Sequence, residues 1–313
     1  MSSLVSGLWS LVCGLMKLLV TGGTGFIGRP LCRALVQQGH EPFVLTRSQG
    51  ARAHAEGVRW LPWDTEEWRR LIGQVDGVVH LAGESLTARR WTAHQKRLIR
   101  DSRVETARRL VEAIAESARR PSVFVSGSAI GYYGARGDEP LEETAAPGRG
   151  FLAELCQAWE AQAQRADALG VRVVRLRIGV VLGRDGGALA KMATPFRLCV
   201  GGPLGSGRQW MSWIHLDDLV GLLLWSLSRA ELSGAVNATA PEPVTMRALC
   251  REVGRCLRRP SWAPVPGVVL KLALGEMADM LLTGQRVLPH VALRAGYAFR
   301  YPQVPQALRA CLR

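Results

Sequence analysis

The sequence predicts an α/β fold, a doubly wound parallel sheet followed by a small, mainly helical C-terminal region. Two observations support this prediction. Short apolar runs alternate with longer segments of helical period from residue 17 to about residue 181, and the first run ends in the glycine-rich stretch VTGGTGFIG. Beyond the proline-rich patch RRPSWAPVPG (258–267), this alternation stops.

The expected elements follow one another in regular order along the chain. Buried strands are predicted at 17–23, 41–48, 58–64, 74–83, 122–129 and 171–181, because each is a short apolar run bounded by turn-forming residues. Helices are predicted at 25–40, 92–118 and 150–169, where apolar residues recur at offsets of three and four. Gly39, Pro121 and Gly170 mark the ends of these helices.

Composition indicates a globular chain. Of its 313 residues, 48% are hydrophobic and 21% are charged. The net charge is +14, but the arginines are scattered in pairs such as Arg89-Arg90, with no dense basic run. We interpret this charge as solvated helix faces, with attraction of an anionic ligand as the alternative, and we expect no nucleic-acid partner.

Cysteine and histidine usage bears on the compartment and on metals. The seven cysteines include no CxxC pair, and the six histidines lie far apart. This pattern favours buried thiols in a reducing, cytoplasmic setting and predicts no metal site.

The first residues form an uncharged apolar leader, 1–15, ahead of Met16. It is shorter than the roughly 20 apolar residues that a membrane span needs, and it lacks the early positive charge of a signal peptide. We therefore expect no transmembrane span. Because MKLLVTGG is typical of a natural start, we expect the leader to be a misassigned extension; a short membrane-touching N-terminus is the alternative.

The stretch VTGGTGFIGRPL predicts a dinucleotide-binding turn. Gly22, Gly25 and Gly28 stand at three-residue steps, directly after a strand and at the start of a helix. Gly22 would allow the tight turn, Gly25 would let the backbone approach a pyrophosphate, and Gly28 would let the helix pack on the strand. The helix amides would then meet the phosphates, so the predicted contact segment also includes Thr24, Phe26 and Ile27.

The end of the second strand indicates which dinucleotide is preferred. A site for NAD usually has an acid at this position, whereas the chain has Thr46 and Arg47. Arg47 would form charge-assisted hydrogen bonds to the extra phosphate of NADP, with Thr46 or Ser48 adding a hydroxyl. Asp64, after the third strand, could accept a hydrogen bond from the adenine amino group. The alternatives are a surface arginine at 47 and a loop or cap aspartate at 64.

These motifs resemble the extended short-chain dehydrogenase/reductase superfamily, in its NAD-dependent epimerase/dehydratase group. The resemblance is carried by TGGTGFIG, by DGVVHLAG (76–83), by SGSAIGYYG (126–134) and by WIHLDDLVGLLLWSL (213–227). It implies a Rossmann fold in which the cofactor passes His80, Leu81, Ala82 and Gly83.

Four further stretches resemble one subgroup, the "epimerase family proteins" with a small C-terminal domain of unknown function. They are RIGVVLGRDGGALAKMATPFRL, GGPLGSGRQWMSWIHLDDL, GEMADMLLTGQRVLP and GYAFRYP, and the resemblance covers about residues 16 to 310. It implies an NADP(H)-binding domain with substrate-side insertions at 16–259 and a small C-terminal domain at 260–313. It defines neither the substrate nor the oligomeric state.

The chain departs from the catalytic members on the helix after the fifth strand, where they carry a Tyr-x-x-x-Lys pair. Glu160 matches a glutamate that often follows the lysine by four residues, which places Leu152 at the tyrosine position and Cys156 at the lysine position. No tyrosine or lysine lies between residues 134 and 190, so a register error would not restore the pair.

Other residues near the fifth strand are therefore the candidates for proton transfer. Ser128 takes the place of the family's active-site serine or threonine, or is a loop hydroxyl bonded to backbone. Tyr132 and Tyr133 follow it, and we predict that one of them donates the proton. Arg103 either reaches the cofactor or is a solvated helix charge. Asp217, at a later helix start beside His215, is either a cap or a substrate ligand.

Two function classes remain open. The first is an NADP(H)-dependent oxidoreductase or epimerase acting on a small-molecule substrate with a rearranged proton donor. The second is a non-catalytic NADP(H)-binding regulatory or scaffold protein, a class loosely consistent with relatives described as cell-division inhibitors.

Overall fold

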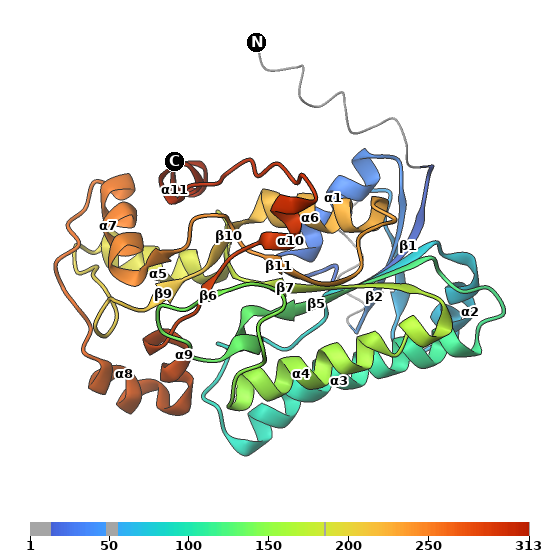
Figure 1. The fold of residues 1–313 in the computed structure, drawn as a ribbon, viewed down its shortest axis with the longest axis horizontal. Coiled ribbons are helices and arrows are strands. Elements are labelled where there is room, and N and C mark those ends of the chain that lie inside the picture. The colour runs from blue at the N-terminus through green and yellow to red at the C-terminus, as the bar shows by residue number, and fades with distance from the viewer. Residues whose placement is uncertain (1–13, 48–55, 185, 313) are drawn as a thin grey trace, which may run out of the picture.

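A seven-stranded parallel sheet forms the centre of the computed structural model, which describes residues 14–47, 56–184 and 186–312 (Figure 1). Its strands are β1 (Lys17–Thr21), β2 (Glu41–Thr46), β3 (Arg59–Pro62), β4 (Gly77–His80), β5 (Val123–Ala129), β7 (Arg172–Ile178) and β11 (Gly234–Ala238). They lie in the order β11-β7-β5-β4-β1-β2-β3. The chain runs outward from β1 to β3, then returns to β4 and continues the other way, which confirms the predicted doubly wound sheet. Ligands bind such sheets where the order reverses, at the carboxyl ends of β1 and β4.

Helices cover both faces of this sheet (Figure 1). One face carries α1 (Gly28–Gln37) and α6 (Leu216–Ser228), and the other carries α3 (Ala93–Glu116), α4 (Phe151–Gln164) and the short α2 (Glu67–Leu71). Successive side chains of each strand point to opposite faces, so Val79 packs with the first group and Val78 with the second. Because both faces are covered, apolar residues from successive positions of the central strands are buried on both sides of the sheet.

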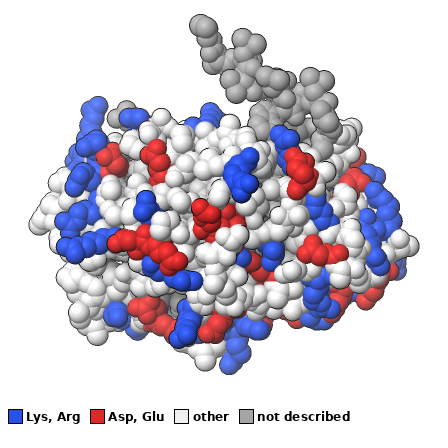
Figure 2. All heavy atoms as spheres, viewed as in Figure 1, with Lys and Arg blue, Asp and Glu red and all other residues white. Residues whose placement is uncertain are grey.

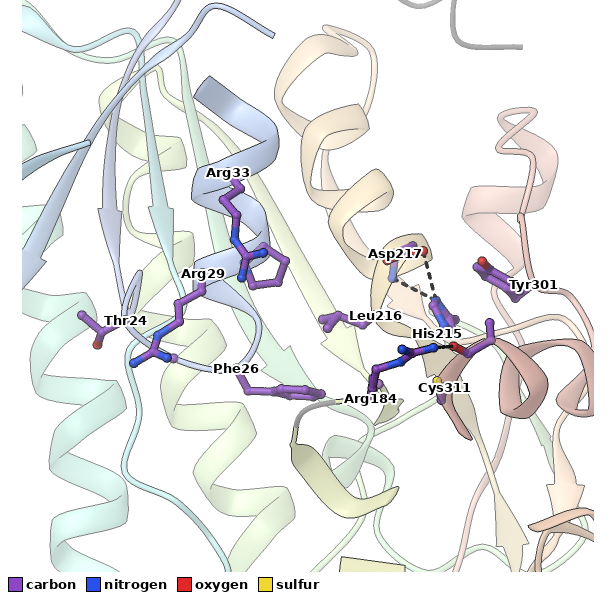
Figure 3. A pocket seen from close by; sticks show the side chains of 14 residues that line it. Thr24, Phe26, Arg29, Arg33, Arg184, His215, Leu216, Asp217, Tyr301 and Cys311 are labelled. Carbon is purple, nitrogen blue, oxygen red and sulfur yellow. Dashed lines mark hydrogen bonds and ion pairs between the residues drawn. The ribbon is translucent and has the colours of Figure 1, made fainter. Parts of the chain in front are cut away.

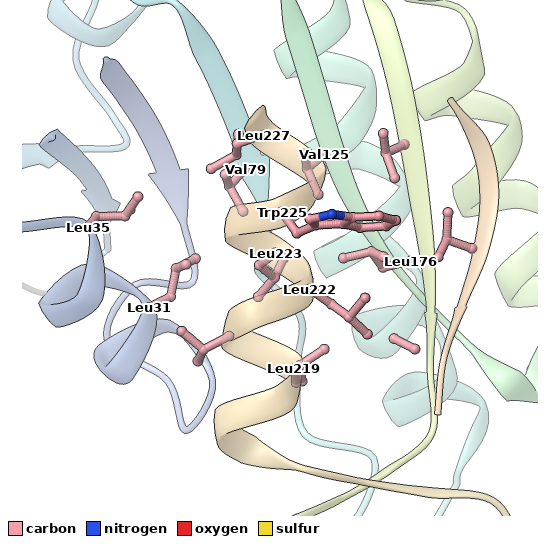
Figure 4. Packing of buried hydrophobic residues seen from close by; sticks show 14 of the residues in the cluster. Leu31, Leu35, Val79, Val125, Leu176, Leu219, Leu222, Leu223, Trp225 and Leu227 are labelled. Carbon is pink, nitrogen blue, oxygen red and sulfur yellow. The ribbon is translucent and has the colours of Figure 1, made fainter. Parts of the chain in front are cut away.

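Helix α6 is the most apolar of the covering helices and lies across the middle of the sheet. Figure 4 shows Leu222, Leu223 and Trp225 packed against Val125 and Leu176 of β5 and β7. The side chains of Leu222 and Leu223 are fully buried. This packing keeps the carboxyl ends of the central strands in a rigid frame, on which a site can be held in fixed geometry.

The last predicted strand, 171–181, is divided by Gly179. Strand β7 ends at Ile178, and β8 (Val180–Leu182) leaves the main sheet to pair with β10 (Trp213–His215). A Cβ at Gly179 would lie 2.7 Å from the carbonyl oxygen of Ser212, so the two segments pass too closely for any side chain. The predicted helix 150–169 likewise divides, into α4 and a short 3-10 turn, η4 (Asp167–Leu169), before Gly170 in the left-handed conformation.

The C-terminal region is mainly helical, as predicted. Beyond residue 260 it contains α8 (Gly267–Leu274), the 3-10 turn η5 (Gly275–Ala278), α9 (Asp279–Leu282), α10 (His290–Arg294) and α11 (Val304–Leu312), and α7 (Met246–Leu257) precedes it. A short strand ties it to the rest of the chain, since β13 (Arg286–Val287) pairs with β6 (Pro140–Leu141). Before α7, β12 (Val244–Thr245) pairs with β9 (Trp210–Met211). Residues of α5 (Gly187–Arg197), α7 and α11 share one hydrophobic core. That core joins residues on both sides of position 260.

Two features of the described residues bear on partners. No helix among them is long and apolar enough to cross a membrane, and residues 1–13 of the predicted leader lie outside the described part of the chain. On the face shown in Figure 2, acidic side chains interrupt the basic ones, which gather in small groups. The basic side chains on this face therefore form separate groups.

Candidate functional site

The glycine loop between β1 and α1 is shaped by close backbone contacts. Gly22 has a φ of +75°, and a Cβ there would lie 2.6 Å from the carbonyl carbon of Leu81. A Cβ on Gly28 would lie 2.1 Å from the carbonyl oxygen of Gly22. Both positions therefore require glycine, because side chains would push α1 and the segment after β4 away from the loop.

No side chain caps the start of α1, although the amide of Arg29 donates to the carbonyl oxygen of Gly25 at 3.1 Å and Pro30 has no amide hydrogen. The N-cap residue is Ile27, and the first turn contains no acidic residue. The first amides of a helix lack intrahelical partners and carry the positive end of the helix dipole. This end of α1 is therefore suited to a phosphate group.

The predicted cofactor residues after β4 lie beside this loop. The amide of Leu81 donates to the carbonyl oxygen of Thr21 at 3.1 Å, and the amide of Ala82 donates to Thr21 Oγ1 at 3.2 Å. Leu81 and Ala82 are half-buried, and Gly83, which follows them, is exposed. The structure thus brings Leu81, Ala82 and Gly83 together with Thr24, Gly25, Phe26 and Ile27 at one edge of the sheet.

His80, the last residue of β4, holds the ends of β1 and β4 together through a buried hydrogen bond. It is fully buried, and burial lowers its pKa to about 4, so the ring is neutral. Its Nδ1 lies 2.7 Å from Thr21 Oγ1, and its Nε2 lies 3.3 Å from the carbonyl oxygen of Arg103. A neutral ring that donates from Nε2 and accepts at Nδ1 satisfies both bonds. This bonding role of His80 was not predicted, although a histidine within a predicted buried strand indicates that its ring needs hydrogen-bond partners.

Arg47 and Asp64 are both exposed, at the same edge of the sheet. Arg47 follows β2 and Asp64 follows β3, and the amide of Trp63 donates to the carbonyl oxygen of Thr46 at 3.1 Å. Ser48, the other predicted hydroxyl, lies outside the described residues.

Ser128, near the end of β5, belongs to a buried network of charged side chains. Its hydroxyl donates to Glu160 Oε1 at 2.7 Å. Glu160 also accepts two hydrogen bonds from Arg177, at 2.9 and 3.0 Å, and all three residues are buried. A charge buried without a partner is strongly unfavourable, so Glu160 and Arg177 each need the other to remain charged in the core. Ser128 therefore bonds a side chain, whereas the sequence analysis weighed a backbone partner as the alternative role.

Arg177 was not among the residues predicted from the sequence. It lies in β7, whose neighbours along the strand are mostly buried apolar residues. An arginine in such a strand needs a carboxylate close by, and that requirement is the signal that could have identified it. Its partner, Glu160, comes from α4, 17 residues earlier in the chain.

The structure separates the two candidate tyrosines, which both lie in the 3-10 turn η3 (Ile130–Tyr133). Tyr133 is fully buried, its hydroxyl donates to Asn237 Oδ1 at 2.7 Å, and it accepts from Arg177 at 2.9 Å. Burial raises the pKa of Tyr133 to about 12. Tyr132 is half-buried with the guanidinium of Arg177 3.5 Å from its ring centroid. Its hydroxyl has no hydrogen-bond partner among the described residues.

Arg103 comes from α3 and lies on the other side of this network. It donates to the carbonyl oxygens of Ile99 at 3.0 Å and Glu84 at 2.9 Å, with its guanidinium 5.5 Å from the ring centroid of Trp159. A Cβ on Gly83 would lie 2.7 Å from Arg103 Cζ. The guanidinium is thus held against the segment after β4 instead of extending into solvent. Burial lowers its pKa, but a guanidinium stays charged at neutral pH.

Helix α4 places Leu152 and Cys156 on its inner side, toward η3. A Cβ on Gly131 would lie 3.2 Å from Leu152 Cβ. Burial raises the pKa of the Cys156 thiol to about 12, so the thiol is neutral. Neither side chain can supply the proton or the positive charge of a Tyr-Lys pair.

The start of α6 settles one alternative. His215 is the N-cap, with its Nδ1 accepting from the amide of Asp217 at 3.1 Å, so Asp217 itself is not the cap. The Asp217 carboxylate lies 3.5 Å from Arg300 and 3.7 Å from His215.

Comparison with known proteins agrees with this arrangement. The sequence profile described as "NAD dependent epimerase/dehydratase family" matches residues 18–238, and a profile described as "Domain of unknown function (DUF1731)" matches residues 265–311. The chain is 43% identical over 304 residues to the chloroplastic "Epimerase family protein SDR39U1 homolog" of Arabidopsis thaliana, covering 95% of this chain and 87% of that protein. It is 36% identical over 296 residues to "Epimerase family protein YfhF" of Bacillus subtilis, covering 94% and 97%.

Among solved structures, the chain is similar to the human epimerase family protein SDR39U1 (isoform 2), crystallised with NADPH. The two are 35% identical, with a TM-score of 0.88, over 95% of this chain and 99% of that one. These matches confirm the resemblance inferred from the motifs, because the family profile spans most of the chain. The chain belongs to the NAD dependent epimerase/dehydratase family.

Proposed function

We propose that the chain binds NADP(H) at the carboxyl ends of β1, β2 and β4 and uses it in an oxidoreductase or epimerase reaction on a small-molecule substrate. The observation that supports this most strongly is the glycine loop. Side chains at Gly22 and Gly28 would collide with backbone, and the start of α1 presents amides with no acidic neighbour. A loop of this kind fits a pyrophosphate, which needs close backbone approach.

The choice of NADP(H) over NAD(H) rests on Arg47. Its exposed guanidinium directly follows β2, where a ribose-binding acid would otherwise stand. The human relative was crystallised with NADPH, which agrees with the same preference. In this proposal Asp64 accepts a hydrogen bond from the adenine amino group. The rest of the dinucleotide lies along Leu81, Ala82, Gly83 and Arg103.

We assign proton transfer to Tyr132 and a structural role to Tyr133. When bound, NADP(H) supplies or accepts a hydride, and a carbonyl substrate then needs a proton donor within hydrogen-bond reach. The hydroxyl of Tyr133 is already engaged by Asn237 and Arg177. Tyr132 lies in the same turn with its ring fixed against Arg177. Its hydroxyl has no partner among the described residues, so it is the one free to act.

Ser128 then orients the substrate as an acceptor. A hydroxyl has one hydrogen, and that of Ser128 is donated to Glu160. Its lone pairs remain to receive a substrate hydroxyl. Arg103 supplies a fixed positive charge near Cys156, which stands at the position of the missing lysine.

A second function is favoured by one specific observation. Leu152 and the neutral Cys156 replace the usual acid-base pair, so the chain could bind NADP(H) without turning over a substrate and report its redox state to a partner. In either case we place the protein in the cytoplasm, because the six cysteines described all carry free thiols.

Mass spectrometry of the purified protein tests the cofactor first, and we expect stoichiometric NADP(H) to co-purify. A screen of NADPH oxidation across a library of carbonyl compounds then separates the two functions. Turnover of any compound supports the enzyme. Bound NADP(H) with no oxidation across the library would favour the regulatory protein, and NAD(H) in place of NADP(H) would overturn the assignment of Arg47.

A further inference from the structure

A pocket of about 620 Å³ lies between α1, the start of α6 and α11 (Figure 3). It borders the glycine loop at Thr24, Gly25 and Phe26, and its far wall includes Tyr301 and Cys311 of the C-terminal region. None of Arg47, Leu81, Ala82, Gly83 or Arg103 lines it. The pocket therefore shares Thr24, Gly25 and Phe26 of the glycine loop with the proposed dinucleotide site and extends from that loop toward the C-terminal region.

Three arginines surround this pocket. Arg29 and Arg33 lie one turn apart on the same face of α1, and Arg184 lies across the pocket with its guanidinium directed toward α11 (Figure 3). All three are exposed. The side chains of Arg29 and Arg33 form no hydrogen bond or ion pair with any described residue, and Arg184 donates one bond, of 3.4 Å, to the carbonyl oxygen of Ala310.

The negative charge available to balance them is small. Among the described lining residues, Asp217 is the one carboxylate, and it already lies 3.5 Å from Arg300. Burial lowers the pKa of His215, so that ring is neutral at physiological pH. Like charges one turn apart also destabilise a helix when nothing compensates them. The described residues that line the pocket thus carry an excess of positive charge suited to an anion.

We propose that this pocket binds the phosphate group of a second ligand, a phosphorylated small molecule other than the dinucleotide. Guanidinium groups match phosphate oxygens in geometry and charge, and Arg29, Arg33 and Arg184 all line this pocket. Tyr301, packed against His215 with ring centroids 3.9 Å apart and ring planes at 38°, offers an aromatic surface for the organic part. The volume is in the range of small-ligand sites. A ligand held there would contact both the glycine loop and α11.

The test is a calorimetric titration of inorganic pyrophosphate into the full-length protein saturated with NADPH. Saturation keeps pyrophosphate away from the glycine loop. We expect binding to the wild type, and binding at least about tenfold weaker in the R29A/R33A double variant and in R184A, since each loses a charge-assisted contact. The matched control is R197A/R251A. It removes two exposed arginines of α5 and α7 that form no hydrogen bond or ion pair with described residues and do not line the pocket.

Three outcomes would overturn the proposal: no binding to the NADPH-saturated protein, equal weakening in the control variant, or pyrophosphate competing with NADPH while R29A/R33A loses NADPH affinity. The last would assign these arginines to the cofactor's own phosphates. NADPH binding is followed separately by fluorescence. If NADPH fails to bind, the proposed function falls, but the effect of R29A/R33A on pyrophosphate binding still tests the pocket.

Discussion

Two parts of one sheet edge are built on different principles. At the ends of β1 and β4 the candidate site is made of backbone: Gly22 and Gly28 leave no room for a Cβ, and amides supply the polar groups. At the end of β5 it is made of side chains, with Ser128, Glu160 and Arg177 joined in one buried network.

Of these two kinds of site, the one made of backbone is easier to predict from a sequence. A backbone cradle needs glycines at fixed spacing, and that spacing is local and readable. A side-chain network is closed by residues far apart in the chain, so its members carry no common motif. We call the ends of β1 and β4 the cofactor half of the site and the end of β5 the chemical half. The cofactor half resembles its family closely, whereas the chemical half lacks the usual Tyr-Lys pair.

The largest expected effect separates the two tyrosines. Tyr132→Phe removes the proposed proton donor, so turnover of a substrate found by screening should fall by about 10²–10⁴-fold. Tyr133→Phe should leave turnover per folded molecule nearly unchanged. It should instead lower the free energy of unfolding by about 1–3 kcal/mol, because Asn237 and Arg177 lose a buried partner. NADPH oxidation and urea denaturation measure the two quantities. The opposite pattern, with Tyr133 essential for turnover, would reverse our assignment.

The second largest effect is expected on stability, when the buried carboxylate is removed. Glu160→Ala leaves Arg177 charged and unpaired, so the free energy of unfolding should fall by about 3–5 kcal/mol. The control is Glu231→Ala, which breaks an exposed pair with Arg229 and should cost about 0.2–1 kcal/mol. Urea denaturation compares the two variants. Similar losses in both would show that the network does not stabilise the chemical half.

A pH effect of similar origin is expected in the cofactor half. The pKa of His80 is lowered from 6.5 to about 4 by burial, so the unfolded chain takes up the proton first as pH falls. Stability should therefore decline between pH 6.5 and 4, by up to about 3 kcal/mol from this group alone. His80→Gln cannot take up this proton, so its decline over the same window should be smaller. Denaturation at several pH values measures both slopes, and parallel slopes would contradict the prediction.

The sequence predicted most of the fold, because its signals are local. Apolar runs and helical periods located six of the seven sheet strands and the helices α1, α3 and α4, with ends displaced by a few residues at glycines such as Gly179, whereas β11 was not predicted. The shared core of α7 and α11 could not be predicted in the same way. Its members, among them Val253 of α7 and Leu308 of α11, come together only through long-range packing, which no pattern in either helix specifies.

The candidate site was predictable to a different extent in its two halves. Positions around Gly22, Arg47 and Leu81 follow from strand ends that must meet at one edge, so the structure brings them together as expected. The sequence alone could not show which of Tyr132 and Tyr133 has a free hydroxyl, because adjacent residues in a turn point in different directions. Only the partners of each hydroxyl distinguish them, and those partners, Arg177 and Asn237, come from β7 and β11.

The central claim is that this edge binds NADP(H) through Arg47, and paired titrations of NADPH and NADH against wild type and Arg47→Ala test it most directly. A charge-assisted phosphate contact contributes roughly 1.5–3 kcal/mol, so the variant should lose about tenfold or more in NADPH affinity. The affinity for NADH, which lacks that phosphate, should barely move, and the wild type should prefer NADPH. Equal affinity of the wild type for both cofactors, or equal losses for both in the variant, would contradict the account.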